Sequence, residues 1–303
     1  MNKVIFKGIL DGIVMDRIVR GGDFTMPTMH LHPEFEIYYL LSGTRCYFIE
    51  NKTYQIAKGN LVLIDAMQIH KTSTLGKSYH DRILIEIMPE PLSTFFEGIS
   101  GIKLQDFFAE NAGILELSES VQKQVEALLY GIMDEFNRKS PHYQAFIMIK
   151  ITELLLLAAR SNTDKRTFSR PSVSQSVKHQ KINDIAEYIM ENYDKVKTLE
   201  EISNHFYVSK SYLSRIFKEV TGFTVQDYIN VYCVKKAREL LENSDMSVSE
   251  IADKLGYNSV TNFERIFKKY METSPLRYRK KMQIIHRKVR ERKEENELIT
   301  IKQ

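Results

Sequence analysis

Three histidines and one glutamate near the start of the chain have residue types and a spacing that suit ligand or metal binding. The sequence reads His30-x-His32-x3-Glu36, and His70 follows later in the chain. Positions 30, 32 and 36 share parity, so their side chains point to the same face of an extended strand. Imidazole nitrogens and a carboxylate can hold iron, manganese, nickel or zinc. The spacing predicts that these four side chains converge, with His70 contributed by a different strand.

A second set of informative residues lies in a segment that occurs twice. Residues 198–202 are similar to residues 247–251, and residues 215–218 and 265–268 both read Arg-Ile-Phe-Lys. Each copy opens with a hydroxyl residue followed three positions later by Glu, the pattern of a helix capping box. The two pairs are Thr198 with Glu201 and Ser247 with Glu250. Each copy predicts a short helix, a turn and a second helix, which together indicate a doubled helix-turn-helix.

The second helix of each copy separates apolar from polar residues. The apolar positions predicted to face inward are Leu213, Ile216, Phe217 and Val220 in the first copy and Phe263, Ile266 and Phe267 in the second. In a major groove arginine can bond guanine and asparagine can bond adenine, whereas lysine neutralises phosphates. The residues predicted to contact base edges are Ser211, Ser214, Arg215, Thr261, Asn262 and Arg265. The residues predicted to contact phosphates are Lys210, Lys218, Lys268 and Lys269. A solvated helix face explains any one of these lysines, but it does not explain the duplicated pattern.

The elements around the histidines read as short strands. Residues 35–41, 45–50, 59–64 and 82–87 are β-branched or aromatic runs separated by turn signals, within a region of strands that extends to about residue 100. Many short strands predict a sandwich or barrel. Helical periodicity then predicts two closing helices over residues 121–136 and 143–160. The two helices carry more apolar surface than one stripe packed against a small barrel requires. The residues that provide it are Leu128, Leu129, Ile132, Leu154, Leu155 and Leu156.

The predicted organisation is an α+β chain of two domains. Its 303 residues exceed what one hydrophobic core usually holds. The predicted parts are a β-rich domain with two closing helices (1–160), a serine-rich linker (161–180), a helical DNA-binding domain (181–283) and a charged tail (284–303). The tail mixes both signs of charge, as a solvated helix with a frayed end does.

Charge and composition narrow the function classes. Residues 1–160 hold 16 Lys and Arg against 19 Asp and Glu, whereas residues 161–303 hold 27 against 20. A basic second half predicts a polyanionic partner. With 43% apolar and 27% charged residues, the chain is unlike disordered, collagen-like or coiled-coil sequences.

Membrane insertion and export are not expected. The densest apolar run, residues 154–159, is far shorter than the roughly 20 residues that a bilayer requires. Lys7 and Asp11 interrupt the first apolar run, which argues against a signal peptide. Cys46 and Cys233 form no Cys-x-x-Cys pair, so neither a zinc knuckle nor a disulfide framework is predicted. We therefore expect a soluble protein in the cytoplasm.

Residues 182–281 resemble the AraC/XylS-type transcription regulators. In the helix between the two copies the matching residues are Ala237, Leu240 and Leu241. In the second copy they are Ile251, Ala252, Gly256, Tyr257, Phe263, Arg265, Phe267, Lys268, Pro275, Tyr278 and Arg279. One departure is Glu272, where the family usually carries a glycine like Gly222. A non-glycine there must tolerate or avoid a left-handed cap.

This resemblance implies a transcription regulator and not an enzyme. Two recognition helices would enter successive major grooves of a double-stranded DNA operator, about 10 base pairs apart. The resemblance also implies a homodimer formed through the helices of the first domain, and contact with RNA polymerase.

Residues 20–90 resemble the cupin signature, carried by His30, His32, Glu36, Gly43, Gly59 and His70. In regulators of this family such a barrel binds a small effector, a sugar or another metabolite, here at His30, His32, Glu36, Tyr38 and His70. No cofactor is then required. The alternatives are a divalent metal on the same three histidines and Glu36, a purely structural barrel, and a metal-dependent cupin enzyme fused to a DNA-binding domain.

Overall fold

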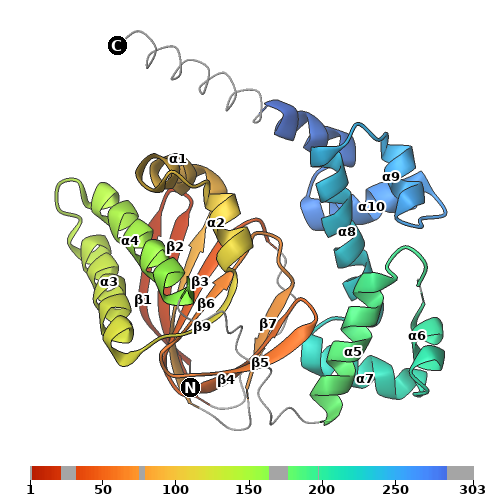
Figure 1. The fold of residues 1–303 in the computed structure, drawn as a ribbon, viewed down its shortest axis with the longest axis horizontal. Helices are drawn as coiled ribbons and strands as arrows, with labels where there is room; N and C mark the ends of the chain where they lie inside the picture. Colours follow the sequence, from red (N-terminus) through yellow and green to blue (C-terminus); the bar gives the residue numbers. More distant parts are fainter. Residues whose placement is uncertain (1, 22–31, 75–78, 164–176, 197, 285–303) are drawn as a thin grey trace. The chain divides into compact units, whose positions relative to one another are not determined.

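The computed structural model describes residues 2–21, 32–74, 79–163, 177–196 and 198–284. Backbone contacts divide the chain into two compact units, residues 1–184 with 219–222, and residues 185–218 with 223–303. The first unit is rich in β-structure and the second is helical (Figure 1). This agrees with the predicted fold class.

Two antiparallel sheets form the centre of the first unit. The larger sheet has the order β1 (Asn2–Leu10), β2 (Ile13–Arg20), β8 (His80–Ile87), β3 (Phe35–Ser42), β6 (Asn60–Ile64) and β9 (Gly113–Glu116). The smaller has the order β5 (Lys52–Ala57), β4 (Thr44–Ile49) and β7 (His70–Ser73). The four predicted strands correspond to β3, β4, β6 and β8 and are confirmed. β1, β2, β5 and β7 lie within the predicted region of strands without having been predicted singly, and β9 lies outside it.

The alternation of side chains along β3 builds two separate cores. Phe35, Ile37 and Tyr39 are buried in the core that the large sheet shares with helices. Tyr38 and Leu40 point the other way and pack with residues of the small sheet. Since neighbouring residues of a strand face opposite sides, this parity decides which side chains line the space between the sheets.

Four helices accompany the large sheet, rather than the predicted pair alone. The expected helices are α3 (Glu119–Arg138) and α4 (Tyr143–Thr163), and they follow α1 (Pro89–Ser100) and α2 (Leu104–Asn111). The expectation of strands up to about residue 100 is therefore wrong after β8. Pro89 at the first turn of α1 and Gly101 at its left-handed C-cap, with φ of 73°, are the signals that mark this helix.

The apolar residues of α3 and α4 mostly pack on their own domain. Leu129, Ile132, Leu154 and Leu155 are fully buried in the core beneath the large sheet, and Leu128 and Leu156 are partly buried against it. The expected surplus of apolar surface is wrong for these residues. The large apolar side chains that stay exposed on the two helices are instead Tyr130, Phe146 and Ile149.

The predicted linker is partly helical. Helix α4 continues to Thr163, and α5 (Val177–Glu191) begins before residue 180. Residues 164–176 of the linker and residues 285–303 of the predicted tail lie outside the described residues.

The second unit contains the doubled helix-turn-helix. The first copy is α6 (Leu199–His205) and α7 (Lys210–Thr221), and the second is α9 (Val248–Lys254) and α10 (Val260–Met271). The long helix α8 (Val225–Asn243) joins them, and residues 275–284 form a further helix. Both predicted capping boxes are present, at Thr198 and at Ser247. Among the described residues no helix is long and apolar enough to span a bilayer.

Side chains near the end of the second unit bind α8. The Tyr278 hydroxyl donates a hydrogen bond to Glu242, and Arg279 Nε donates to the Leu241 carbonyl at 3.2 Å. The Tyr278 ring also packs against Phe267, with centroids 5.8 Å apart. These residues of the resemblance therefore hold the second copy to α8.

Glu272 adopts the left-handed conformation that its position demands. It caps α10 with φ of 55° and ψ of 6°, where Gly222 has φ of 85° after α7. An L-residue is strained in this region and glycine is not.

Candidate functional site

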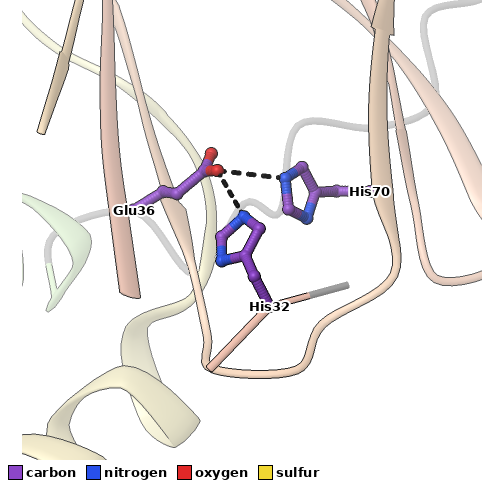
Figure 2. Close-up of side chains that lie close together, drawn as sticks. All are labelled: His32, Glu36 and His70. Atoms are coloured by element: carbon purple, nitrogen blue, oxygen red, sulfur yellow. Dashed lines mark hydrogen bonds and ion pairs between the residues drawn. The ribbon is translucent and has the colours of Figure 1, made fainter. Parts of the chain in front are cut away.

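Three of the four predicted side chains meet between the two sheets. We call His32, Glu36 and His70 the His–Glu cluster (Figure 2). Glu36 Oε1 lies 2.7 Å from His32 Nε2 and 3.2 Å from His70 Nε2. The side chains of Glu36 and His70 are almost fully buried, and that of His32 is 18% exposed. The predicted convergence is confirmed for these three, and His30 lies outside the described residues.

Different elements position the three side chains. Glu36 lies on β3 with the parity of Tyr38, and His70 opens β7 opposite the buried Ile49. His32 precedes β3, in contrast to the expected continuous strand, and its carbonyl accepts a hydrogen bond from the Met67 amide at 2.9 Å. A turn-like approach therefore brings His32 to Glu36, where shared strand parity was the expected reason.

The protonation of the cluster follows from its hydrogen bonds. Burial alone would raise the pKa of Glu36, but the charge of His70 and hydrogen bonds from both histidines hold that pKa well below its ordinary range. Burial also opposes the charged form of His32, yet its hydrogen bond to Glu36 raises the pKa of that imidazole. The Glu36 carboxylate is thus ionised at neutral pH.

The tautomer of His70 is set by the backbone. Its Nδ1 lies 2.8 Å from the Gln68 carbonyl, so Nδ1 carries a proton and donates it. The opposite nitrogen, Nε2, faces Glu36 and needs either a second proton or a cation between the two groups. A metal-ligating histidine uses the same arrangement, with one nitrogen held by a carbonyl and the other free to coordinate.

Tyr38, the remaining residue of the predicted effector site, lies next to the cluster on the same face of β3. It is 4% exposed, and its ring packs edge-on against Tyr47 with centroids 5.3 Å apart. Burial raises the pKa of its hydroxyl, which keeps the phenol neutral. Tyr38 therefore offers a neutral hydroxyl at the interior of the domain.

The two recognition helices, α7 and α10, divide their residues as predicted. All seven apolar positions are buried, each at most 6% exposed, which confirms the inward face. The outward residues are exposed in both helices; these are Lys210, Ser211, Ser214, Arg215, Lys218, Thr261, Asn262, Arg265, Lys268 and Lys269. The exposed faces carry their charged and polar groups into solvent, as contact with DNA requires. Their roles at bases or phosphates remain predictions.

Some of these polar side chains already have partners within the second unit. Lys210 pairs with Glu200 at 3.0 Å and Lys269 with Asp227 at 3.3 Å. Arg265 donates to the Asn262 side chain at 2.9 Å, and Arg215 lies over the Tyr212 ring at 5.7 Å. The arginine contacts orient each guanidinium on its helix face, while the lysine pairs must open before those ammonium groups can bind phosphate.

Arg45, His80 and the half-buried Arg20 are among the polar residues facing the interior that were not predicted. Arg45 and His80 are at most 1% exposed. Their signal in the sequence is a charged residue in an apolar strand run, since Arg45 opens the predicted strand 45–50 with the same parity as Tyr47. Strand parity applied beyond the histidines would have found Arg45.

Two family models match the chain in the order of its domains. Residues 18–155 match the family described as AraC-like ligand binding domain, and residues 202–281 match a helix-turn-helix domain. The first match covers the sheets and the His–Glu cluster, and the second covers α7, α8, α9 and α10.

Relatives of similar length support this assignment. The chain is 26% identical to the melibiose operon regulatory protein of Escherichia coli, over 84% of each chain. It is 24% identical to the transcriptional activator RhaR of Mannheimia succiniciproducens, over 83% of this chain and 86% of that one. Among solved structures, ToxT from Vibrio cholerae shares 13% identity over 88% of this chain and 98% of its own, with a TM-score of 0.36. The two family matches, together with the two regulators that match more than four fifths of the chain, show what it is. The chain belongs to the AraC family of transcription regulators, with a ligand-binding domain followed by a helix-turn-helix DNA-binding domain.

Proposed function

We propose that this regulator reads DNA with Arg215 and Arg265 and is controlled by a small effector bound between its two sheets. The observation that carries the first part is the duplication itself. Each recognition helix exposes an arginine at the equivalent position, over a buried Ile-Phe pair that fixes the helix. A bidentate arginine–guanine contact is a common source of base discrimination in a major groove.

Because the two recognition helices differ in sequence, each chain reads an asymmetric site. Ser211, Ser214 and Arg215 serve one half, and Thr261, Asn262 and Arg265 serve the other. Lys218 and Lys268, one turn after each arginine, bind phosphates, with Lys210 and Lys269 as further phosphate contacts. A site selected from random DNA by the full chain is expected to contain two unlike elements about 10 base pairs apart. Selection of no sequence, or of a palindrome bound by one chain, would contradict this arrangement.

The effector site is proposed to comprise His30, His32, Glu36, Tyr38 and His70. Of these, Glu36, Tyr38 and His70 are buried, and buried polar groups inside a small domain suit a small polar molecule. One relative is named for the melibiose operon, which supports a sugar or another metabolite as the class. The test is a thermal-shift screen of the full chain against metabolites, because a ligand that binds only the native state raises the melting temperature. A hit must also change operator binding, and a stabilising ligand without that effect would contradict control by this site.

A divalent metal at the His–Glu cluster is a second candidate. The ligand atoms of His32, Glu36 and His70 all lie within 4.8 Å of one another, and the Gln68 carbonyl fixes the tautomer of His70 that coordination requires. A bound ion would be held by the two Nε2 atoms and the carboxylate, and would offer open positions to an effector oxygen.

Metal content after supplementation and dialysis tests this candidate. About one equivalent is expected in the wild type and none in His32→Ala. His142→Asn, which removes an exposed imidazole elsewhere in the domain, is the matched control and is expected to keep the metal. A wild type that holds no ion leaves the effector site without a metal and also removes the basis for the enzyme alternative.

We further propose a homodimer and contact with RNA polymerase in the cytoplasm. Phe146 and Ile149 on α4 are 46% and 44% exposed and support an interface there. Sedimentation of the full chain is expected to give a dimer that Ile149→Glu dissociates. The control Ile5→Glu, at an exposed position of β1, is expected to remain dimeric.

Transcription in vitro from a selected operator tests the proposed contact with RNA polymerase.

A further inference from the structure

The interior of the first unit carries another group of polar side chains, which begins at Tyr38 and extends to the end away from the His–Glu cluster. We call Arg20, Tyr38, Arg45 and His80 the basic cluster. Strand register separates the two ends. Glu36 pairs with Glu86 near one end of β8, whereas His80 at the other end of β8 pairs with Arg20, the last residue of β2.

Strand parity directs these four side chains into the same space. His80 shares parity with Leu84, which packs beside Tyr38 between the sheets. Directly paired residues of antiparallel strands present their side chains on the same face, so Arg20 follows His80. On β4, Arg45 has the parity of the buried Tyr47, which packs in the same core. The four residues therefore come from four strands of both sheets and converge.

Among the described residues at this end positive charge predominates, since Asp81 beside His80 is already ion-paired with Arg17. After burial, the charge of Arg20 lowers the pKa of Arg45. Burial and then the two arginines hold the pKa of His80 at about 4, so its imidazole is neutral at neutral pH. Arg82, on the same face of β8, forms an ion pair with Asp16 and adds no net charge. An anion placed between Arg20 and Arg45 would relieve their repulsion.

One buried polar atom of the cluster has no partner. Within the described part of the chain, His80 Nδ1 is buried without a hydrogen bond, whereas the Tyr38 hydroxyl interacts with Arg45. Arg45 Nη2 donates to Thr72 Oγ1 at 3.0 Å, which fixes the guanidinium. Buried polar side-chain atoms in proteins are nearly always hydrogen-bonded. A ligand oxygen beside His80 would satisfy Nδ1.

We propose that the basic cluster binds the anionic end of the effector, a carboxylate or a phosphate. This inference rests on the proposed effector site and narrows the effector from any small polar metabolite to an acid. The planar guanidinium fork matches the geometry of both oxyanions, and Arg45 is held in place before the ligand arrives. Tyr38 lies two residues along β3 from Glu36, so the remaining hydroxyls of the same molecule can reach the His–Glu cluster. The expected effector carries an acid group at one end and neutral polar groups at the other.

The test is calorimetry and thermal shift on the full chain with gluconate, glucose 6-phosphate, inorganic phosphate and glucose, each against sodium chloride of equal ionic strength. Saturable binding of at least one anion is expected, with glucose inactive. The gluconate and glucose 6-phosphate arms distinguish a carboxylate from a phosphate.

Arg20→Gln is the decisive variant because Arg20 is only half-buried at the end of β2. Loss of its charge-assisted hydrogen bonds is expected to weaken anion binding about tenfold or more. Lys7→Gln removes the same charge from an exposed position of β1 and is expected to change nothing. Anion binding by Arg45→Gln is interpreted only if the melting temperature shows that this variant folds.

The proposal is overturned if no anion binds above the salt control, or if Arg20→Gln binds the anion as tightly as the wild type. A different outcome is that glucose binds equally to the wild type and to Arg20→Gln while no anion binds. That result would support the effector site but contradict an anionic effector. Failure of the proposed function has a different signature, since the full chain would then select no DNA sequence.

Discussion

The two domains keep their functional side chains in opposite places. In the ligand-binding domain Glu36, Arg45 and His70 are buried between the sheets, whereas in the DNA-binding domain Arg215 and Arg265 stand on exposed helix faces. A buried polar group takes part in both folding and binding, because removing it leaves its partners unsatisfied. An exposed one can be replaced with little effect on the fold. Function and stability are therefore coupled in the first domain and divided between two helix faces in the second.

Substitutions on the inward face of a recognition helix should change the stability of the fold and not the recognition of DNA. Phe267→Ala is expected to destabilise the protein by about 3 to 5 kcal/mol, since the ring is fully buried against Phe263 and Tyr278. Urea unfolding followed by circular dichroism measures this loss. If Phe267→Ala loses less than about 1 kcal/mol, the division between the two faces of α10 does not hold.

Substitutions on the outward face should change DNA recognition and not the stability of the fold. Arg215→Ala or Arg265→Ala is expected to cost roughly 1 to 3 kcal/mol of operator affinity and to relax preference at one half of the site. The free energy of unfolding should change by less than about 0.5 kcal/mol. Lys218→Ala and Lys268→Ala are the controls, because a phosphate contact weakens all DNA alike and lowers the salt slope by about one. Full affinity and specificity in both arginine variants would exclude these helices from the groove.

Coupling in the first domain should appear as a pH dependence of stability. The folded pKa of His80 is about 4, below the roughly 6.5 expected in the unfolded chain, so the unfolded state binds more protons between these values. Stability is therefore present above pH 6.5 and lost as the pH falls towards 4. Between pH 7 and pH 5.5 His80 should account for a loss of about 1 kcal/mol.

The difference between wild type and His80→Gln isolates this contribution, because other groups titrate in the same range. His80 faces Arg20 on β2 and Arg45 on β4, and Asp81 opposes their effect. Parallel pH profiles for the two proteins would mean that His80 is not held neutral by its surroundings.

The smallest expected effect distinguishes the two helix-turn-helix copies. Glu272→Gly should stabilise the second domain by roughly 0.5 to 1 kcal/mol, because it removes an L-residue from a positive-φ cap. Thermal unfolding measures the gain. Glu264→Gly, in the middle of α10, is the contrasting control and should destabilise by about 1 kcal/mol. Destabilisation by Glu272→Gly would show that the Glu272 side chain stabilises the cap by more than its backbone strain costs.

Much of the second domain was predictable because its signals are local. Capping boxes at Thr198 and Ser247 and the 3.6-residue spacing around Phe217 and Phe267 depend only on neighbours in sequence. The convergence of His32, Glu36 and His70 was also predictable, although the path of the chain at His32 was not. A turn before β3 is decided by contacts such as that with Met67, more than 30 residues away.

The rest of the first domain depends on pairing between distant segments. β1 and β2 mix charged and apolar residues, such as Lys7 and Asp16, because one face of this pair is left partly open. The basic cluster escaped prediction for a related reason. Arg20 and His80 become neighbours only through the register of β2 with β8, and no local pattern encodes that register.

The short helices that begin at the two capping boxes also bear on how the second domain unfolds locally. Helices α6 and α9 have seven residues each, about two turns, and isolated helices of that length do not persist in water. In the second copy the apolar side of α9 packs with that of α10 in one core, so these two helices should form and melt as one cooperative unit. Amide hydrogens of α9 and α10 should therefore exchange with solvent at a common rate set by that unit, and the recognition helix should never be exposed to DNA without its partner in place.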